Sequence, residues 1–153
     1  MTDPRPLEIQ AVDGGDPDLA RALAAAGLPV DDLTEPGRCF FAYRTQGRPA
    51  GFGGFERHGA HVLLRSIVVP EARRGDGLGA AILAHLMAEA AGATSVWLLT
   101  TAAAPFFARH GFLAVPRSEA PAEILATRQA AAICPASATL MTRRFAGRCA
   151  GEA

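Results

Sequence analysis

A nearly continuous apolar run at residues 61–69 is the feature that most constrains the fold. It reads His-Val-Leu-Leu-Arg-Ser-Ile-Val-Val and ends at Pro70. Runs of this kind are typical of central strands, which are buried on both faces. A glycine-rich loop and a helical pattern that ends at Gly92 follow it, and residues 95–100 are a second apolar run. A strand, helix, strand order predicts that the two strands are parallel.

Shorter patterns precede this unit. Residues 7–12 alternate apolar and polar side chains, which predicts a strand. Asp16 followed by Pro17 predicts the start of a helix that Gly27 ends, and a loop at 31–36 follows. Two further strands, at 39–44 and 50–55, are expected to form a hairpin with its turn at Gln46-Gly47, and the next turn lies at 57–59.

The C-terminal part predicts a short helix at 105–110, a strand at 112–115, a helix at 121–132 and a last strand at 137–145. We therefore expect an α+β fold with a mixed, mostly antiparallel central sheet of about seven strands and flanking helices. At 153 residues the chain has room for one core. We expect a single domain over 1–146 and a C-terminal tail at 147–153.

Charge and cysteine content exclude several classes of function. Fifteen basic and fifteen acidic residues cancel, which argues against nucleic-acid and anionic-membrane partners. The first residues lack the apolar core of a secretory signal, and no stretch reaches the length of a membrane span, so we expect a cytoplasmic protein. Cys39, Cys134 and Cys149 are far apart, so neither disulfides nor a metal site is predicted.

The loop at 73–79 reads Arg-Arg-Gly-Asp-Gly-Leu-Gly and lies between the apolar strand and the helix. The first N–H groups of a helix have no internal partner and carry partial positive charge, so an anion is favoured there. Gly75, Gly77 and Gly79 let a pyrophosphate approach the backbone. The alternative is a turn that only starts a helix. Dinucleotide-binding and P-loop patterns fit poorly, because four strands come first and no Gly-Lys-Ser/Thr ending is present.

At this loop the sequence resembles the GNAT superfamily of N-acetyltransferases. The family's acetyl-CoA motif, Arg/Gln-x-x-Gly-x-Gly/Ala, is matched by residues 74–79, and the resemblance extends to 67–70 and to 106–112. It implies that acetyl-CoA is the co-substrate, that no metal is required, and that the two parallel strands splay apart to admit the pantetheine arm. Asp76 departs from the family, where this position is often basic, and a carboxylate there weakens CoA binding unless it faces solvent.

The resemblance assigns the acetyl-CoA contacts to the strand end, the loop, the start of the helix and one aromatic side chain: Ile67, Val68, Val69, Arg74, Gly75, Asp76, Gly77, Leu78, Gly79, Ala80 and Phe107. Because dimers are common in this fold, it also implies that a homodimer can form.

Acetyl transfer to an amine needs a neutral nitrogen and a stabilised leaving thiolate. Glu56, at the end of a predicted strand, is the candidate base, and its alternative is a solvated hairpin carboxylate. Many relatives use a tyrosine of the short helix as the acid, but Phe106 and Phe107 stand there. Ser66, Thr101 or water is expected to protonate the thiolate, unless its low pKa makes an acid unnecessary.

Arg65 interrupts the apolar run, and a lone guanidinium in a central strand needs an anionic partner. That partner is either the acid group of the substrate or an internal acid such as Glu56. Thr100, Thr101 and Arg117 are further candidates for substrate binding, and plain surface charge is equally plausible for Arg117. The expected acceptor is a small amine that also carries an acid group.

Two stretches resemble a narrower group within the family. Residues 98–102 with Phe106 and Phe107, and Thr127 with 133–138, are similar to bacterial arsenic-resistance N-acetyltransferases and to the acetyltransferase part of glutamate N-acetyltransferases. The first resemblance implies acetylation of arsenical or phosphinic glutamate analogues such as arsinothricin and phosphinothricin. Acetylation of ordinary amino acids stays open as an alternative, as does a non-catalytic acetyl-CoA sensor. For Cys134, packing is favoured over binding of arsenic.

Overall fold

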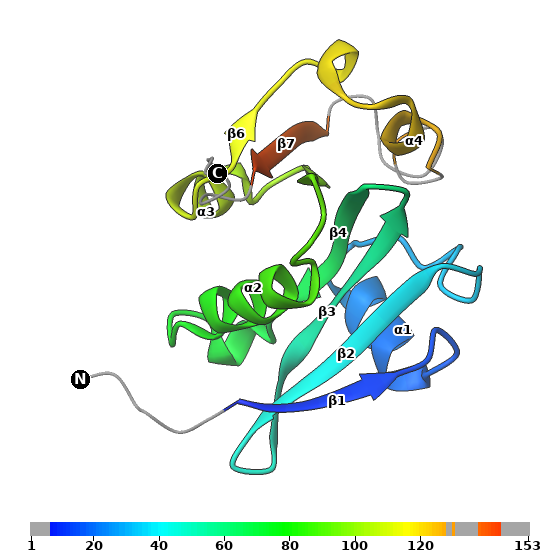
Figure 1. Ribbon diagram of the computed structural model, residues 1–153. Coiled ribbons are helices and arrows are strands. Elements are labelled where there is room, and N and C mark those ends of the chain that lie inside the picture. Colours follow the sequence, from blue (N-terminus) through cyan, green and yellow to red (C-terminus); the bar gives the residue numbers. More distant parts are fainter. Residues whose placement is uncertain (1–6, 128–129, 131–137, 145–153) are drawn as a thin grey trace. The chain divides into compact units, whose positions relative to one another are not determined.

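A computed structural model describes residues 7–127, 130 and 138–144 (Figure 1). Its strands are β1 (Glu8–Val12), β2 (Arg38–Thr45), β3 (Arg48–His58), β4 (His61–Val68), β5 (Ser95–Thr100), β6 (Leu113–Ala114) and β7 (Thr139–Arg144). They form a seven-stranded sheet in the order β1-β2-β3-β4-β5-β7-β6. The pair β4 and β5 is parallel, whereas β1 with β2, β2 with β3, β5 with β7 and β6 with β7 are antiparallel. The predicted fold class is confirmed.

The helices are α1 (Pro17–Ala25), α2 (Leu78–Glu89), α3 (Ala104–Arg109) and α4 (Ala122–Leu125), with short 3-10 turns η1 (Glu71–Arg73) and η2 (Arg117–Glu119). α1 begins as predicted, because the Asp16 carboxylate accepts a hydrogen bond from the Leu19 N–H at 3.2 Å. The hairpin of β2 and β3 also turns where predicted. Gln46 and Gly47 have φ values of 53° and 73°, the left-handed pair that a tight hairpin turn requires.

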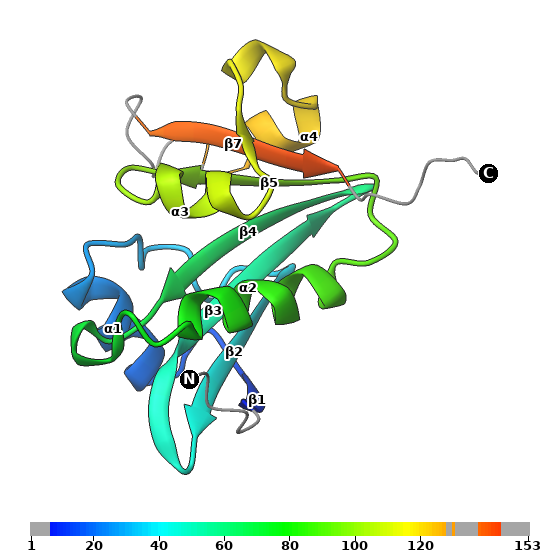
Figure 2. The same ribbon diagram turned by 90° about the vertical axis from the view of Figure 1, so that its left-hand side faces the viewer.

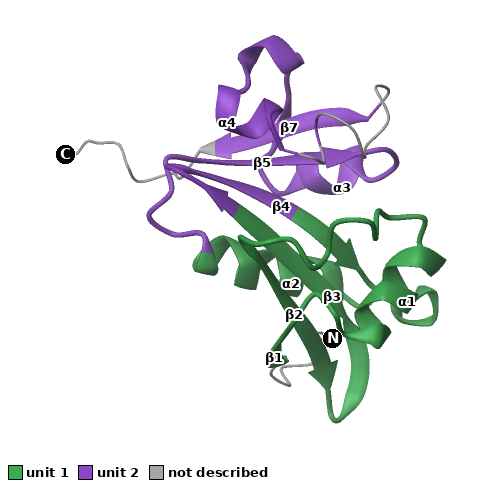
Figure 3. Cartoon of the chain, turned by 90° about the vertical axis from the view of Figure 1, so that its right-hand side faces the viewer, with its two compact units in different colours: residues 1–56, 65–89 green, residues 57–64, 90–153 purple. Residues whose placement is uncertain are grey.

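The chain divides into two compact units (Figure 3). The first comprises residues 1–56 and 65–89, and the second comprises 57–64 and 90–153. The boundary therefore runs through β3 and β4, since each strand contributes one end to each unit. The single domain over 1–146 stays a prediction, and the predicted tail lies outside the described residues.

In the first unit, helices cover both faces of the sheet (Figure 1). On one face Leu19 and Leu23 of α1 pack in a buried cluster with Phe40 of β2. On the other face the Tyr43 hydroxyl lies 2.7 Å from Nδ1 of His85 in α2. Phe40 and Tyr43 differ by an odd number of positions and so point to opposite faces of β2. This unit contains the predicted glycine loop between β4 and α2.

In the second unit, β5 lies between the first half of β4 and β7 (Figure 2). Leu63, Trp97 and Leu140 form a buried cluster with Ile124 of α4. The parallel register runs from His61 opposite Ser95 to Leu63 opposite Trp97. The strand, helix, strand interpretation of the central sequence is therefore confirmed.

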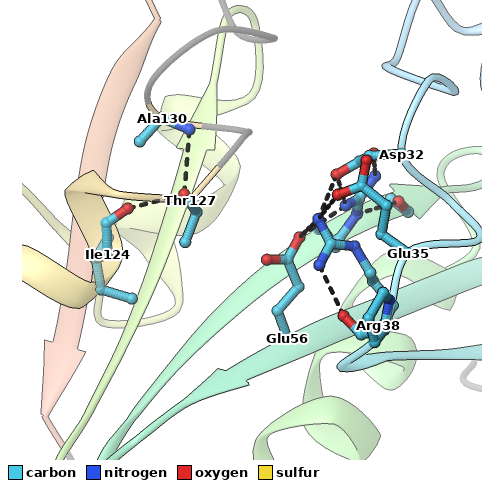
Figure 4. Close-up of polar contacts among 10 residues, drawn as sticks. Asp32, Glu35, Arg38, Glu56, Ile124, Thr127 and Ala130 are labelled. Carbon is cyan, nitrogen blue, oxygen red and sulfur yellow. Dashed lines mark hydrogen bonds and ion pairs between the residues drawn. The ribbon is translucent and has the colours of Figure 1, made fainter.

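The predicted helix at 121–132 is interrupted, because residues 126–127 form a turn and a bend, whereas Ala130 is again helical. α4 ends at Leu125, because the Thr127 hydroxyl donates to the Ile124 carbonyl at 2.8 Å and accepts from the Ala130 N–H at 3.2 Å. Figure 4 shows both bonds, and side-chain bonds of this kind to the backbone compete with helical hydrogen bonds. Residues 128–129 and 131–132 of the prediction lie outside the described residues.

Candidate active site

The glycine loop has the backbone geometry of an anion-binding turn. Gly75 and Gly77 have φ values of 92° and 80°, and a Cβ on either would meet no atom within 4 Å. Glycine is therefore needed there for backbone conformation and not because the space is filled. The first helical bond of this region is donated by the Ala81 N–H to the Gly77 carbonyl at 3.1 Å. The N–H groups of residues 78–80 consequently have no partner within the helix.

The side chains of the loop leave this backbone accessible. Arg74 and Asp76 are exposed, whereas Leu78 is 8% exposed and anchors the start of α2 in the core. The Nε of Arg74 donates to the Val69 carbonyl at 3.2 Å. Because Asp76 faces solvent, water screens its charge. Its repulsion of an anionic ligand is therefore weak. The loop therefore fits the pyrophosphate of acetyl-CoA in backbone geometry and in local charge.

Ser66 marks an irregularity in β4 just before the predicted acetyl-CoA residues. It has a φ of 60°, which is rare for a residue other than glycine and breaks the regular extension of a strand. The three residues that follow, Ile67, Val68 and Val69, are half-buried. A close approach from β3 helps to set their position, since a Cβ on Gly51 would lie 2.2 Å from the Val68 carbonyl oxygen.

Arg65 is the centre of a buried ion cluster in the first unit, and Figure 4 labels its members Asp32, Arg38 and Glu56. Its Nη1 donates to Oδ2 of Asp32 and Oε2 of Glu56, each at 2.7 Å, and its Nη2 donates to Oδ1 of Asp32 at 2.7 Å. Its Nε donates to the Ser66 hydroxyl at 3.1 Å. Asp32 and Glu56 are both fully buried, with exposed fractions of 0%.

The charges in the cluster stabilise one another. Burial alone would raise the pKa of Asp32, but hydrogen bonds and charges from Arg65 and Arg38 outweigh it and lower this pKa to about 2. Burial alone would lower the pKa of Arg65, and the partners Asp32 and Glu56 raise it instead. Asp32 and Arg65 therefore stay charged at neutral pH.

Arg38 extends the cluster along β2. Its Nη2 lies 2.8 Å from Oδ2 of Asp32, 3.4 Å from Oε1 of Glu35 and 3.7 Å from Oε2 of Glu56. Its buried Nε has no hydrogen-bond partner among the described residues. With Arg65, the cluster holds three carboxylates and two guanidinium groups, so its formal net charge is −1.

For Arg65, the structure shows the internal ion pair that the sequence left open as an alternative. The contribution of Arg65 to substrate binding stays a prediction. Both of its Nη groups donate hydrogen bonds to the carboxylate of Asp32. For Glu56, the interpretation as a solvated hairpin carboxylate is wrong, because this side chain is buried against Arg65. Its role as base stays a prediction.

The remaining predicted residues belong to the second unit. The Thr100 hydroxyl accepts a hydrogen bond from the Ala103 N–H at 2.9 Å, and Thr101 is exposed. Arg117 donates to the Ala130 carbonyl at 3.1 Å. Phe107 is 7% exposed and packs edge-on against Phe106 and Phe112. Thr100 and Arg117 thus have local structural partners, and Phe107 is largely a core residue.

Tyr43, the only tyrosine of the chain, is buried in the core of the first unit. Burial and the charge of Glu89 raise its pKa, so its hydroxyl keeps its proton, and this hydroxyl is hydrogen-bonded to Nδ1 of His85. The Nε2 of His85 lies 3.3 Å from Oε2 of Glu89. Tyr43 therefore serves to hold α2 on the sheet.

Sequence reasoning missed Asp32 and Arg38. The segment at 31–36 reads as a loop, and in the structure it has no regular secondary structure. The isolated guanidinium of Arg65 signals that a buried acid is needed, but its partner Asp32 lies 33 positions away in the chain. A contact at that separation has no local pattern, so only the fold identifies it.

Among the described residues, no group of three or more His, Cys, Asp or Glu side chains is arranged to hold a metal ion. In that same part of the chain, no helix is both long and apolar enough to cross a membrane. Cys39 is an exposed free thiol, and Cys134 and Cys149 lie outside the described residues.

Comparisons with solved structures show the same fold. N-acetylglutamate synthase from Neisseria gonorrhoeae, complexed with coenzyme A and N-acetyl-glutamate, aligns with a TM-score of 0.74 and 18% identity over 93% of this chain and 36% of that chain. Rv2747 from Mycobacterium tuberculosis, in complex with CoA and NLQ, aligns with a TM-score of 0.66 and 18% identity over 90% of this chain and 99% of that chain. The chain thus spans about a third of the length of the N. gonorrhoeae enzyme.

A GNAT-family acetyltransferase from Staphylococcus aureus aligns with a TM-score of 0.63 and 15% identity over 90% of this chain and 99% of that chain. Identities this low show the fold alone. A search of curated proteins found no match. The family model of the acetyltransferase (GNAT) domain matches residues 35–113, more than half of the chain, including β4, the glycine loop, α2 and β5. The chain therefore belongs to the GNAT acetyltransferase family.

Proposed function

We propose that this enzyme acetylates the amino group of a small amino-acid-like acceptor, in particular an arsenical or phosphinic analogue of glutamate, and so confers resistance to it. The glycine loop at the start of α2 is the observation that carries the transfer chemistry, because it combines unpaired N–H groups with two left-handed glycines. The acceptor class rests on the segments at 98–102 and 106–107, which resemble arsenic-resistance N-acetyltransferases.

We assign the binding site for acetyl-CoA, the acetyl donor, to the first unit. Acetyl-CoA supplies an acetyl group activated as a thioester. The N–H groups of 75–80 and the exposed guanidinium of Arg74 are proposed to bind its pyrophosphate. The backbone of Ile67, Val68 and Val69 is proposed to hold the pantetheine arm, with the Val69 N–H polarising the thioester carbonyl. Phe107 stays a proposed contact from the second unit.

The ion cluster supports an amine acceptor. Its net charge of −1 favours an ammonium group nearby over an anion. We assign the base to Glu56, which acts on the acceptor ammonium directly or through water and yields the neutral nitrogen that attack requires. Arg65 and Asp32 would then act as positioning residues, because they hold the Glu56 carboxylate in one place.

Ser66 is the proposed acid. Its hydroxyl accepts a hydrogen bond from Nε of Arg65, and an oxygen that accepts from a cation donates its own proton more readily. The proton would go to the leaving thiolate, and Ser66 would regain one from the attacking nitrogen, which loses a proton as it becomes the amide. In the second unit, Thr100, Thr101 and Arg117 stay the candidates for binding the acid group of the acceptor.

Acetylation of glutamate or another ordinary amino acid is the second candidate. It is favoured by the fold shared with N-acetylglutamate synthase, which was solved with N-acetyl-glutamate bound. In both candidates the acceptor has an amine beside an acid group, so the chemistry is the same. They differ in which acid group the enzyme prefers.

Steady-state kinetics with arsinothricin, phosphinothricin and glutamate would separate the candidates. The enzyme would be mixed with acetyl-CoA and each acceptor, and thiol release would be followed. A kcat/KM at least about tenfold higher for arsinothricin or phosphinothricin than for glutamate supports the resistance function, since tenfold corresponds to about 1.4 kcal/mol of discrimination. The reverse order supports a metabolic role. CoA binding without thiol release for any acceptor would refute acceptors of this class.

A further inference from the structure

The guanidinium of Arg73, next to the proposed phosphate-binding arginine, is directed at the hairpin of β2 and β3. Its Nη1 donates to the carbonyl of Pro49 at 2.7 Å and to that of Arg48 at 3.3 Å. Its Nη2 donates to the Thr45 hydroxyl. All these residues belong to the first unit. Arg73 thus ties the 3-10 turn before the loop to a hairpin 24 to 28 positions earlier in the chain.

Arg74 has a different environment. It is exposed, and its Nε bond to the Val69 carbonyl is the only hydrogen bond of its side chain among the described residues. Its two Nη groups are therefore available to a ligand. The half-buried Arg73, by contrast, uses both of its Nη groups within the protein. The two adjacent arginines therefore differ in their contacts: the Nη groups of Arg73 are bonded within the protein, and those of Arg74 have no such bond to a described residue.

We propose that Arg73 is a positioning residue for acetyl-CoA, one that fastens the start of the loop to the β2–β3 hairpin and does not touch the co-substrate. This inference rests on the proposal that the loop at 73–79 binds acetyl-CoA. Thr45 is the hairpin side chain through which Arg73 acts. Neither residue belongs to the GNAT motif at 74–79, and neither is assigned to the acceptor.

The physical basis is the entropy of the loop. Gly75 and Gly77 give the loop conformational freedom, which must be lost when its N–H groups converge on a pyrophosphate. Fixing Arg73, two positions before Gly75, lowers this entropic cost before the ligand arrives. Arginine suits this task because its planar guanidinium bonds the two carbonyl oxygens and the hydroxyl from two separate nitrogen atoms, whereas the donors of lysine all lie on one nitrogen.

The hairpin is a firm support for such an attachment. The Arg44 side chain donates to the Gly47 carbonyl at 3.2 Å, and the Gly47 N–H lies 3.4 Å from a carboxylate oxygen of Glu8 in β1. Close packing of β3 against the end of β4 is enforced at Gly51, where no side chain fits beside Val68. The hairpin turn is therefore held from two sides.

A double-mutant cycle on CoA affinity tests the proposal without any acceptor. The variants are Arg73→Ala, Thr45→Val and the double variant, with CoA binding measured by isothermal titration calorimetry. Thr45→Val removes the hydroxyl and keeps the branched shape of the side chain. Arg73→Lys, which keeps the charge and loses the fork, replaces Arg73→Ala if the latter does not fold. The control cycle pairs Thr45→Val with Arg74→Ala.

We expect Arg73→Ala to weaken CoA binding about tenfold, Thr45→Val to weaken it about threefold, and the double variant to be no weaker than Arg73→Ala, because the two residues share one contact. Arg73→Lys is expected to fall between the wild type and Arg73→Ala. In the control cycle the losses of Arg74→Ala and Thr45→Val should multiply.

Three results would overturn the inference. If Arg74→Ala weakens CoA binding and neither Arg73→Ala nor Arg73→Lys does, Arg73 is not a positioning residue and the loop proposal stands. If the losses of Arg73→Ala and Thr45→Val multiply, Arg73 does not act through Thr45. If no variant at Arg73 or Arg74 changes CoA affinity, the loop itself does not bind CoA, and the proposed donor site fails together with this inference.

Discussion

The guanidinium of Arg65 binds both carboxylate oxygens of Asp32, with each nitrogen-to-oxygen distance at 2.7 Å. This bidentate pair joins the segment after α1 to the middle of β4, and both side chains are removed from solvent. A buried pair with such geometry is costly to break on one side, because the remaining charge stays buried without its partner. Through this ion pair, Asp32 stabilises the fold. It also holds Arg65, which in turn positions Glu56, the proposed base.

The Asp32 pair predicts a loss of stability in acid. Since the pKa of Asp32 is lowered to about 2, its contribution is fully present above the unfolded-state pKa near 4 and is lost as the pH falls through about 2. We expect Asp32→Asn to lower the free energy of unfolding at pH 7 by about 3 kcal/mol. We also expect it to flatten the decline between about pH 4 and pH 2.

Urea denaturation at several pH values measures this effect. Asp31→Asn is the matched control, because Asp31 is an exposed neighbour of the same type. An equal decline below pH 4 in the wild type and in Asp32→Asn would show that the ion pair does not set the acid response.

Glycines 51 and 47 predict contrasting effects of the same substitution. Both have positive φ values, 140° and 73°, but a Cβ on Gly51 would lie 2.2 Å from the Val68 oxygen, whereas one on Gly47 would meet nothing within 4 Å. Gly47→Ala should cost about 1 kcal/mol from backbone strain alone. Gly51→Ala should cost at least about 3 kcal/mol and raise the KM for acetyl-CoA, because the end of β4 must shift.

Thermal unfolding and steady-state kinetics of the two variants check this prediction. A Gly51→Ala protein whose stability and KM match those of Gly47→Ala would mean that β3 and the end of β4 can separate at little cost.

Gly77 and Gly92 form a second matched pair, one at each end of α2. Their φ values are 80° and 99°, and a Cβ added to either glycine would meet no atom within 4 Å. Both alanine variants should lose similar stability, about 1 kcal/mol. Only Gly77→Ala should weaken CoA binding, by about tenfold, since only Gly77 directs N–H groups at the proposed pyrophosphate position. Equal CoA affinities of the two variants, measured by calorimetry, would contradict the donor site.

Glu56→Gln tests the proposed base. Replacing the carboxylate by an amide removes the proton acceptor and leaves the shape of the side chain, so kcat should fall by about 10² and the acidic limb of the pH–rate profile should disappear. Asp32→Asn should retain this limb, because Asp32 only positions Arg65. An unchanged pH profile in Glu56→Gln would exclude Glu56 as base.

Local sequence patterns were sufficient to predict most of the fold. Asp16 with Pro17 correctly predicted the start of α1, and Gln46-Gly47 correctly predicted the hairpin turn, because capping and turn chemistry depend on adjacent residues. The parallel pair β4 and β5 followed from the order of elements. The interruption of the predicted helix at 121–132 was missed because helix-forming composition does not show that the Thr127 hydroxyl bonds the backbone.

The candidate site was less accessible to sequence reasoning. The glycine loop is contiguous, so its motif is visible in the chain. The partners of Arg65 come from the segment after α1 and from β3, and Arg38 joins them from β2. Such a cluster depends on strand register and on a loop folded over the sheet, and neither is encoded in a local pattern. Arg73 likewise lies next to the motif, but its contact with Thr45 exists only in the folded chain.

We propose that this chain transfers an acetyl group from acetyl-CoA to the amine of an amino-acid-like acceptor. Mass spectrometry of the acceptor after reaction, with thiol release measured in the same sample, tests it most directly. We expect one acetyl group on the amino nitrogen of arsinothricin or phosphinothricin for each thiol released, and no product from an acceptor whose amine is blocked. Tight CoA binding with no acetylated product and no thiol above the hydrolytic background would contradict it.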